Sequence, residues 1–182
     1  MRVIAGRFRG RKLTPPEDMR LRPTADRVRE SLFNMLAHGL DLDFAAARVA
    51  DIFAGTGALG IEALSRGAGH ATFVDNHTAS LALVRGNLAA LGIGREATVL
   101  KADATRLSAA GSPYDLVFLD PPYGKDLVTP TLGALLDGGW VQAGAIVVIE
   151  CASTDAPALP DRFGIEKKRE IGDTRILITR VR

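Results

Sequence analysis

One segment, residues 114–119 (Tyr-Asp-Leu-Val-Phe-Leu), limits the possible folds more than any other part of the chain. It is rich in β-branched and aromatic residues, which is typical of a strand buried on both faces of a parallel sheet. Pro121 and Pro122 follow closely and cannot donate to a sheet ladder, so the chain must leave the sheet there. The sequence therefore places Asp120-Pro121-Pro122-Tyr123 at the carboxyl edge of the sheet, where open α/β folds bind their ligands.

Strand-like and helix-like segments alternate along most of the chain. We predict strands at 49–54, 70–75, 97–102, 114–119 and 145–151, and helices at 24–39, 58–65 and from about residue 81 to Gly92. Two closing runs, 164–171 and 174–181, form a predicted antiparallel pair. This order predicts an α/β fold with a doubly wound, mostly parallel sheet and right-handed crossovers.

The N-terminal region is basic. Residues 1–30 contain nine Arg or Lys and four acids, whereas the other 152 residues contain fourteen against seventeen. Gly6 and Gly10 divide residues 3–13 into two short extended pieces, which predicts a short basic β-hairpin. We expect an N-terminal hairpin or arm over residues 1–20, typical of polyanion binders, and one domain over residues 21–182. In the helix that follows, Thr24 is the predicted N-cap, and Arg27 and Arg29 are expected to face solvent or a ligand.

Composition excludes several classes of protein. The chain is 47% hydrophobic and 24% charged, as in globular proteins, and has no apolar run of about eighteen residues. The N-terminus lacks the apolar core of a signal peptide, so we expect a cytoplasmic protein. A single cysteine, Cys151, excludes an internal disulfide, and the three histidines show no metal-ligand spacing. No metal site is expected.

A glycine-rich turn follows the first predicted strand. Gly55, Gly57 and Gly60 satisfy the dinucleotide fingerprint, and Asp75 follows where a ribose-binding acid belongs. A nicotinamide-dependent oxidoreductase is therefore one candidate. A phosphate-binding P-loop is excluded because no Gly-Lys-Ser/Thr follows the glycines.

Three acids favour S-adenosylmethionine as the cofactor over a dinucleotide. Asp51 precedes the glycines, where it would repel a pyrophosphate but attract a ligand that bears an ammonium and a sulfonium. Asp75 can accept both ribose hydroxyls, and Asp103, after the third strand, can accept from the adenine amine. With Asp120, these acids end four consecutive predicted strands.

The Asp120 motif suits a particular acceptor. The exocyclic amine of a nucleobase is a poor nucleophile because its lone pair is delocalised into the ring. The Asp120 carboxylate and the Pro121 carbonyl are pure acceptors that can hold the two amine hydrogens, and Tyr123 can stack on the flipped base. An amine held in this way directs its lone pair toward an electrophile.

The chain resembles the Rossmann-like, seven-stranded, S-adenosylmethionine-dependent methyltransferases, and among them the RsmD type, which methylates the exocyclic N2 of a guanine in small-subunit (16S) ribosomal RNA. The glycine-rich and Asp-Pro-Pro-Tyr motifs are shared by many amino-methyltransferases, whereas the arginine-rich opening and the Arg-Pro-Thr stretch are more specific. The matching stretches are Arg2-Val3-Ile4-Ala5-Gly6, Arg9-Gly10-Arg11-Lys12-Leu13, Arg22-Pro23-Thr24, Asp26-Arg27-Val28-Arg29-Glu30, Asp51-Ile52-Phe53-Ala54-Gly55-Thr56-Gly57 and Asp120-Pro121-Pro122-Tyr123.

The resemblance implies a role for each matched residue. Asp120, Pro121 and Tyr123 would form the catalytic group, and the cofactor would be bound by Asp51, Gly55, Gly57, Asp75 and Asp103. The implied reaction is an in-line displacement at the methyl carbon, with positioning and desolvation supplying most of the acceleration. The residues expected to contact RNA phosphates are Arg7, Arg9, Arg11, Lys12, Arg22 and Arg27. The expected partner is small-subunit ribosomal RNA, naked or within an assembled subunit, and the expected state is a monomer without membrane contact.

Several alternatives remain open from the sequence. The acceptor could be adenine N6, cytosine N4 or a protein glutamine amide instead of guanine N2. Carbon methylation would need a cysteine nucleophile, for which Cys151 is the one candidate, although a cysteine that ends an apolar strand is usually core. A non-catalytic ribosomal RNA chaperone with a relic pocket is a further alternative.

Overall fold

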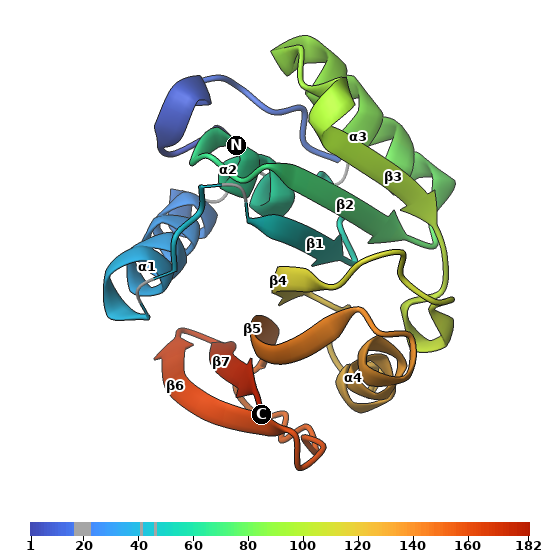
Figure 1. Cartoon of the computed structure of the whole chain (residues 1–182). Helices are drawn as coiled ribbons and strands as arrows, with labels where there is room; N and C mark the ends of the chain where they lie inside the picture. Colours follow the sequence, from blue (N-terminus) through green and yellow to red (C-terminus); the bar gives the residue numbers. More distant parts are fainter. Residues whose placement is uncertain (17–22, 41, 46) are drawn as a thin grey trace.

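The computed structural model describes residues 1–16, 23–40, 42–45 and 47–182. Within these residues, one seven-stranded sheet has the order β3-β2-β1-β4-β5-β7-β6 (Figure 1). Strands β1 to β5 run parallel, whereas β7 is antiparallel to both β5 and β6. The predicted α/β fold with a mostly parallel sheet is thus confirmed. The strands are β1 (Arg48–Ile52), β2 (His70–Asp75), β3 (Ala97–Lys101), β4 (Tyr114–Leu119), β5 (Val141–Ala152), β6 (Phe163–Ile171) and β7 (Thr174–Val181).

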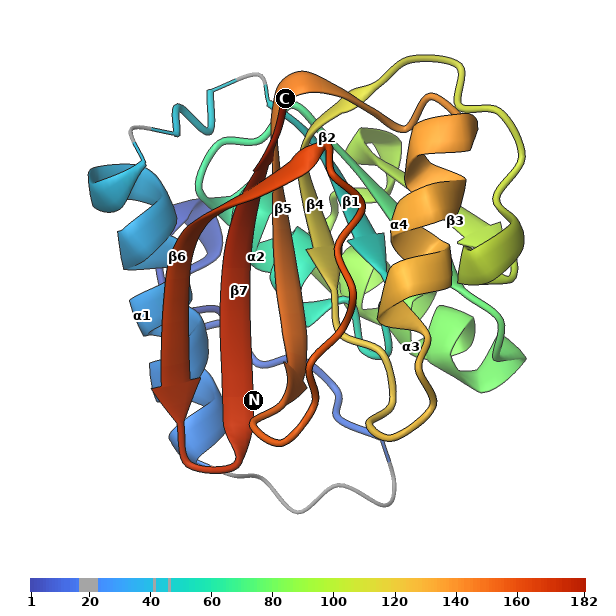
Figure 2. The same ribbon diagram turned by 90° about the horizontal axis from the view of Figure 1, so that it is seen from below.

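The two faces of the sheet are covered differently (Figures 1 and 2). One core joins α1, α2 and α3 to strand residues such as Phe73 and Phe118, and the other joins α4 to residues such as Val117 and Leu119. Phe118 and Leu119 belong to opposite cores because successive strand side chains alternate between faces. None of the helices in the described parts of the chain has the length and apolar content needed to cross a membrane. The helices are α1 (Pro23–Gly39), α2 (Ala58–Ser65), α3 (Thr78–Leu91) and α4 (Val128–Asp137), with short 3₁₀ helices η1 (Gly6–Phe8), η2 (Gly94–Glu96) and η3 (Ala104–Arg106).

The predicted limits are most accurate where glycine or proline bounds a segment. Strands β2 and β4 and helix α2 have the residue limits predicted, and Gly92 ends α3 in the left-handed conformation, with φ +72°. Strand β5 is longer than predicted, since it begins at Val141 and ends at Ala152. Helix α4 was not predicted as a separate element.

The N-terminal segment does not form the predicted two-stranded hairpin. Residues 1–16 contain a single antiparallel bridge, Arg2–Lys12, and helix η1 replaces regular strand pairing. The segment packs on α2: a Cβ at Gly6 would lie 1.9 Å from the Ser65 carbonyl oxygen, and the Glu62 carboxylate accepts hydrogen bonds from two backbone amides of the segment. Backbone hydrogen bonds beside the bridge, from Val3 N–H to the Arg11 carbonyl and from Leu13 N–H to the Met1 carbonyl, act together with these contacts on α2 to fix the conformation. The predicted domain boundary at residue 20 lies outside the described residues.

Helix α1 corrects two further predictions. It begins at Pro23, so Thr24 is its second residue and not its N-cap. Arg27 is exposed as expected, but Arg29 is only 6% exposed. The Arg29 guanidinium donates to the carbonyl oxygen of Arg2 at 2.5 Å and to Asp26 Oδ1 at 3.0 Å. Arg29 therefore connects α1 to the N-terminal segment. The first residues of the chain cover the Arg29 side chain, which explains its burial.

Candidate active site at the carboxyl edge of the sheet

The carboxyl edge of the sheet carries the acids that the sequence places at four strand ends. The strand order β3-β2-β1-β4 brings these four residues side by side. Along the edge they follow the order Asp103, Asp75, Asp51, Asp120. The predicted cofactor-binding and catalytic acids thus share one edge, as expected for parallel strands.

A fifth acid, Glu150, extends this row and was missed by sequence reasoning. Leu119 of β4 pairs with Ile149 of β5, so Asp120 and Glu150 occupy adjacent positions on neighbouring strands. The available signal was an acid directly after the apolar run 145–149, the same pattern as Asp120 after 116–119. We call these five residues the acidic row.

Asp51 is buried and is held by the first turn of α2. Its Oδ2 accepts a hydrogen bond from the backbone N–H of Gly60 at 2.9 Å, so it meets the positive end of that helix. Burial raises the pKa of Asp51 to about 7; the Gly60 hydrogen bond opposes this effect and the nearby Asp75 carboxylate adds to it. Position 60 must be glycine, since a Cβ there would lie 2.4 Å from the ring of Phe73.

The turn between β1 and α2 has an unusual backbone. Gly55 and Gly57 have φ values of +56° and +78°, which glycine adopts at little cost. Phe53 also has a positive φ, +64°, which is strained for a bulky residue and is characteristic of functional sites. A Cβ built on Gly55 would meet no atom closer than 4.0 Å, so the space beside this backbone is open.

Asp75 connects two loops of the edge. Its Oδ2 accepts from the backbone N–H of Gly55 at 3.0 Å, and its Oδ1 accepts from the backbone N–H of His77 at 2.8 Å. Because Oδ1 also lies 3.3 Å from His77 Nδ1, Oδ2 is the oxygen that retains a lone pair for a ligand hydroxyl. Asp75 therefore fixes the glycine-rich turn and can still accept hydrogen bonds from outside.

Asp103 is exposed and caps η3. Its Oδ1 accepts from the backbone N–H and the hydroxyl of Thr105, at 2.9 and 2.8 Å. These hydrogen bonds hold the pKa of Asp103 below its usual value. Its Oδ2 makes no hydrogen bond to the described residues, so it is available to a ligand.

Asp120 differs from the other three aspartates because its carboxylate has no hydrogen-bond partner within the described part of the chain. Its side chain reaches solvent, but protein crowds the carboxylate and reduces its hydration. This desolvation, together with the charges of Glu150 and Asp51, raises the pKa of Asp120 well above its usual range. Pro121 next to it is buried. Asp120 is thus an acceptor that the protein itself leaves unused.

Tyr123 is held by its hydroxyl while its ring stays accessible. The hydroxyl donates to Glu150 Oε1 at 3.0 Å and lies 3.1 Å from the hydroxyl of Thr174, whereas the residue is 45% exposed. Partial burial raises the pKa of Tyr123, and burial also raises that of Glu150 against the effect of the tyrosine hydrogen bond. Two strands, β5 and β7, therefore orient this ring beside Asp120.

The predicted RNA-binding residues are not equally available. Arg7 pairs with Glu96, and Arg11 donates to the carbonyl oxygen of Ala90 at 3.1 Å, so both contact the region around α3 and η2. The remaining described candidates, Arg9, Lys12 and Arg27, are exposed. Arg22 lies outside the described residues.

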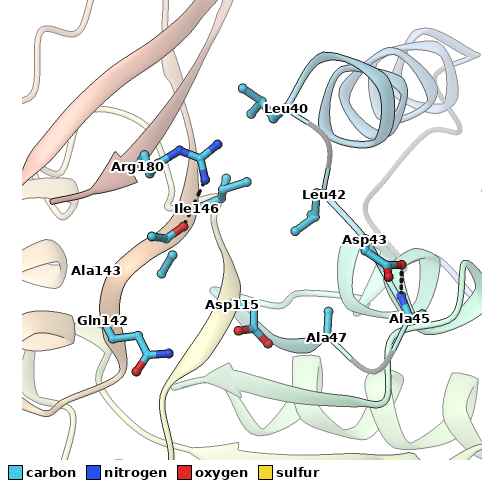
Figure 3. A pocket seen from close by; sticks show the side chains of 12 residues that line it. Leu40, Leu42, Asp43, Ala45, Ala47, Asp115, Gln142, Ala143, Ile146 and Arg180 are labelled. Atoms are coloured by element: carbon cyan, nitrogen blue, oxygen red, sulfur yellow. Dashed lines mark hydrogen bonds between the residues drawn. The ribbon is translucent and has the colours of Figure 1, made fainter.

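Cys151, the candidate nucleophile for carbon methylation, lines a hollow together with Pro121, Pro122 and Tyr123. Cys151 is buried and burial raises the pKa of its thiol, which disfavours the thiolate that carbon methylation needs. A separate hollow measures about 380 Å³. Figure 3 shows some of its lining residues, including Leu42, Asp115, Gln142 and Arg180. Asp115 is near the start of β4, so this hollow opens at the amino edge, opposite the acidic row.

Comparison with known proteins gives one consistent result. The sequence model of the family described as Conserved hypothetical protein 95 matches residues 1–180. The chain is 38% identical to the ribosomal RNA small subunit methyltransferase D of Escherichia coli K12, over 94% of this chain and 85% of that protein. It is 36% identical to the Bacillus subtilis protein YlbH over the full length of both. The solved structure of Escherichia coli yhhF matches with a TM-score of 0.86 and 37% identity, covering 100% of this chain and 97% of that one.

Proposed function

The chain belongs to the RsmD-type family described as Conserved hypothetical protein 95, and on that premise we propose that it is an S-adenosylmethionine-dependent methyltransferase of ribosomal RNA. Its acceptor is the exocyclic N2 amine of a guanine in the small-subunit RNA. The observation that carries the proposal is Asp120, a carboxylate without a hydrogen-bond partner among the described residues, beside the accessible ring of Tyr123 and next to the glycine-rich turn.

The glycine-rich turn and the acids beside it fit this cofactor. The open space beside Gly55 admits a ligand, and Asp51 and Asp75 make the site attractive to cations and hostile to a pyrophosphate. Asp51, Gly55 and Gly57 would hold the methionine end, Asp75 the ribose and Asp103 the adenine. When bound, S-adenosylmethionine supplies an electrophilic methyl group on a sulfonium.

Asp120 and Pro121 orient the acceptor amine. The carboxylate of Asp120 and the carbonyl oxygen of Pro121 accept one amine hydrogen each, which turns the nitrogen lone pair toward the methyl group. Restricting the amine in this way converts a two-body encounter into an effectively unimolecular step. Because the pKa of Asp120 is raised, its carboxyl group becomes ionised, and able to accept the amine hydrogen as a carboxylate, at a higher pH than an ordinary aspartate.

Tyr123 positions the base. A nucleobase must leave its helix to reach the strand end, and an exposed aromatic ring offers it a stacking surface. Glu150 and Thr174 fix that ring by binding its hydroxyl, so the stacking surface is oriented before the base arrives. The base and the cofactor then meet at Asp120.

Adenine, cytosine and a glutamine side chain are the rival acceptors. Adenine N6 and cytosine N4 present the same amine, and the amine-holding pair alone does not distinguish them from guanine. The family membership and the 38% identity to a small-subunit ribosomal RNA methyltransferase favour a ribosomal guanine over a glutamine side chain. A nicotinamide oxidoreductase is disfavoured by the four carboxylates that line the edge around the turn.

The proposal is tested by incubating the protein with labelled S-adenosylmethionine and small-subunit ribosomal RNA, both naked and as small ribosomal subunits. Mass spectrometry of the digested nucleosides should show N2-methylguanosine. N6-methyladenosine or N4-methylcytidine would assign a different acceptor, and the absence of label from both substrates would refute the proposal.

A further inference from the structure

A basic groove lies between α1 and the edge strand β6, outside the site described above. Figures 1 and 2 both show α1 beside β6. The hollow between them measures about 600 Å³. Its charged side chains are Arg27, Lys167 and Arg169 with one acid, Glu30, and His38 also lines it. We refer to this surface as the α1–β6 groove.

The alternation of β6 explains why the cations face α1. Lys167 pairs with Ile178 and Arg169 with Ile176, and both isoleucines belong to the core on the α1 side of the sheet. The two cations therefore project toward α1, whereas Lys168 points to the other face. Gly39 gives the ammonium room, because a Cβ there would lie 2.1 Å from Lys167 Nζ. The pairing of β6 with β7 therefore places these two cations on the face that carries α1.

No described residue forms an ion pair with the cations of the groove. Among the described residues, Arg27, Lys167 and Arg169 make no ion pair and no side-chain hydrogen bond. In the N-terminal segment, by contrast, Arg7 pairs with Glu96 and Arg11 binds a backbone carbonyl. The groove therefore offers three cations without an ionic partner among the described residues, in addition to the exposed Arg9 and Lys12 of the N-terminal segment.

The groove also leads toward the candidate active site. Strand β6 ends at Ile171, which pairs with Thr174, and Thr174 binds the hydroxyl of Tyr123. Arg169 lies two residues before Ile171, about 7 Å along the strand. A polyanion in the groove would thus pass close to the base-stacking tyrosine.

We propose that the α1–β6 groove binds the sugar–phosphate backbone of the RNA beside the target nucleotide, with Arg27, Lys167 and Arg169 contacting phosphates. This inference rests on the proposed function, which supplies RNA as the substrate. The contacts give affinity and register and do not read sequence, since phosphates carry no base information.

The test compares two double charge reversals of equal size. Lys167→Glu with Arg169→Glu alters the groove, and Arg85→Glu with Arg95→Glu alters two exposed residues near α3 and serves as the control. Binding to small-subunit ribosomal RNA and to small ribosomal subunits is measured over a range of salt concentrations. For the groove variant we expect affinity to fall about tenfold or more at physiological salt and the log–log salt slope to decrease by about 2.

Further readouts separate this inference from the proposed function. Calorimetry with S-adenosylhomocysteine and thermal unfolding should match the wild type in both variants, and the groove variant should show a raised KM for RNA with little change in kcat. Wild-type-like affinity and salt slope in the groove variant, or an equal loss in the control, would overturn the groove assignment. Methylation by the wild-type protein tests the proposed function independently of either variant.

Discussion

Within the acidic row, Asp51 and Asp75 are held in a different way from Asp120. Asp51 and Asp75 each accept backbone hydrogen bonds from neighbouring loops, and both are buried. Asp120 reaches solvent and accepts no hydrogen bond from the described residues, although it lies on the next strand. The difference indicates that the first two carboxylates stabilise the neighbouring loops, whereas the third is free to serve the substrate role proposed for it. Substitutions along the row should therefore separate stability from chemistry.

The largest expected effect is the loss of methyl transfer in Asp120→Ala. Without the carboxylate the acceptor amine loses one of its two fixed contacts, and we expect the single-turnover rate to fall by about a thousandfold, as when one preorganised polar contact is removed elsewhere. Stability should not fall, because the substitution removes a carboxylate crowded by Glu150 and Asp51. A rate within tenfold of wild type, or a clear loss of stability, would show that Asp120 supports the fold and not the chemistry.

The second prediction concerns Asp51: the substitution Asp51→Ala should lower stability before it affects chemistry. The buried N–H of Gly60 would lose its acceptor, which costs about 1–3 kcal/mol, and α2 would lose its N-terminal anchor. Urea unfolding of Asp51→Ala and Asp120→Ala measures the contrast directly. Asp51→Asn keeps an oxygen acceptor for Gly60 and serves as the matched control, with stability near wild type but weaker binding of S-adenosylmethionine.

Features that depend on local sequence could be predicted without the structure. Strands β2 and β4 were predicted with their observed limits because glycine or proline bounds them. The four aspartates could be assigned to one edge because parallel strands end together. These inferences needed no knowledge of distant contacts.

Several of the failures depend on distant contacts, although the omission of helix α4 does not. Glu150 lies within a strand, and the pairing of Leu119 with Ile149 places it beside Asp120. The N-terminal segment packs on α2 around Gly6, which pairing between its own two halves does not predict. Burial of Arg29 likewise depends on the carbonyl of Arg2, 27 residues away in the chain. Register and docking between segments are not encoded in any local pattern.

Glu150 supplies the third prediction, a change in pH dependence. Its charge contributes to the raised pKa of Asp120, so removing that charge in Glu150→Gln should lower the pKa. Because protonated Asp120 offers fewer acceptor sites, the acidic limb of the rate profile should move to lower pH, by about one unit. Thr174→Val removes the other partner of the Tyr123 hydroxyl without changing charge, and its acidic limb should not move. An unmoved limb in Glu150→Gln would show that the two carboxylates do not interact.

The smallest effect is expected at the exposed end of the row. Asp103→Ala removes one acceptor for the adenine amine, and because the carboxylate is fully exposed, water can replace the lost contact. We expect the affinity for S-adenosylhomocysteine to fall only about two- to fivefold, measured by calorimetry. Thr105→Val removes the hydroxyl that binds Asp103 Oδ1 but keeps the carboxylate, so it should change the affinity less. A hundredfold loss of affinity in Asp103→Ala would mean that the bound cofactor shields this residue from water. Burial in the free protein would then not predict how much each acid contributes to binding.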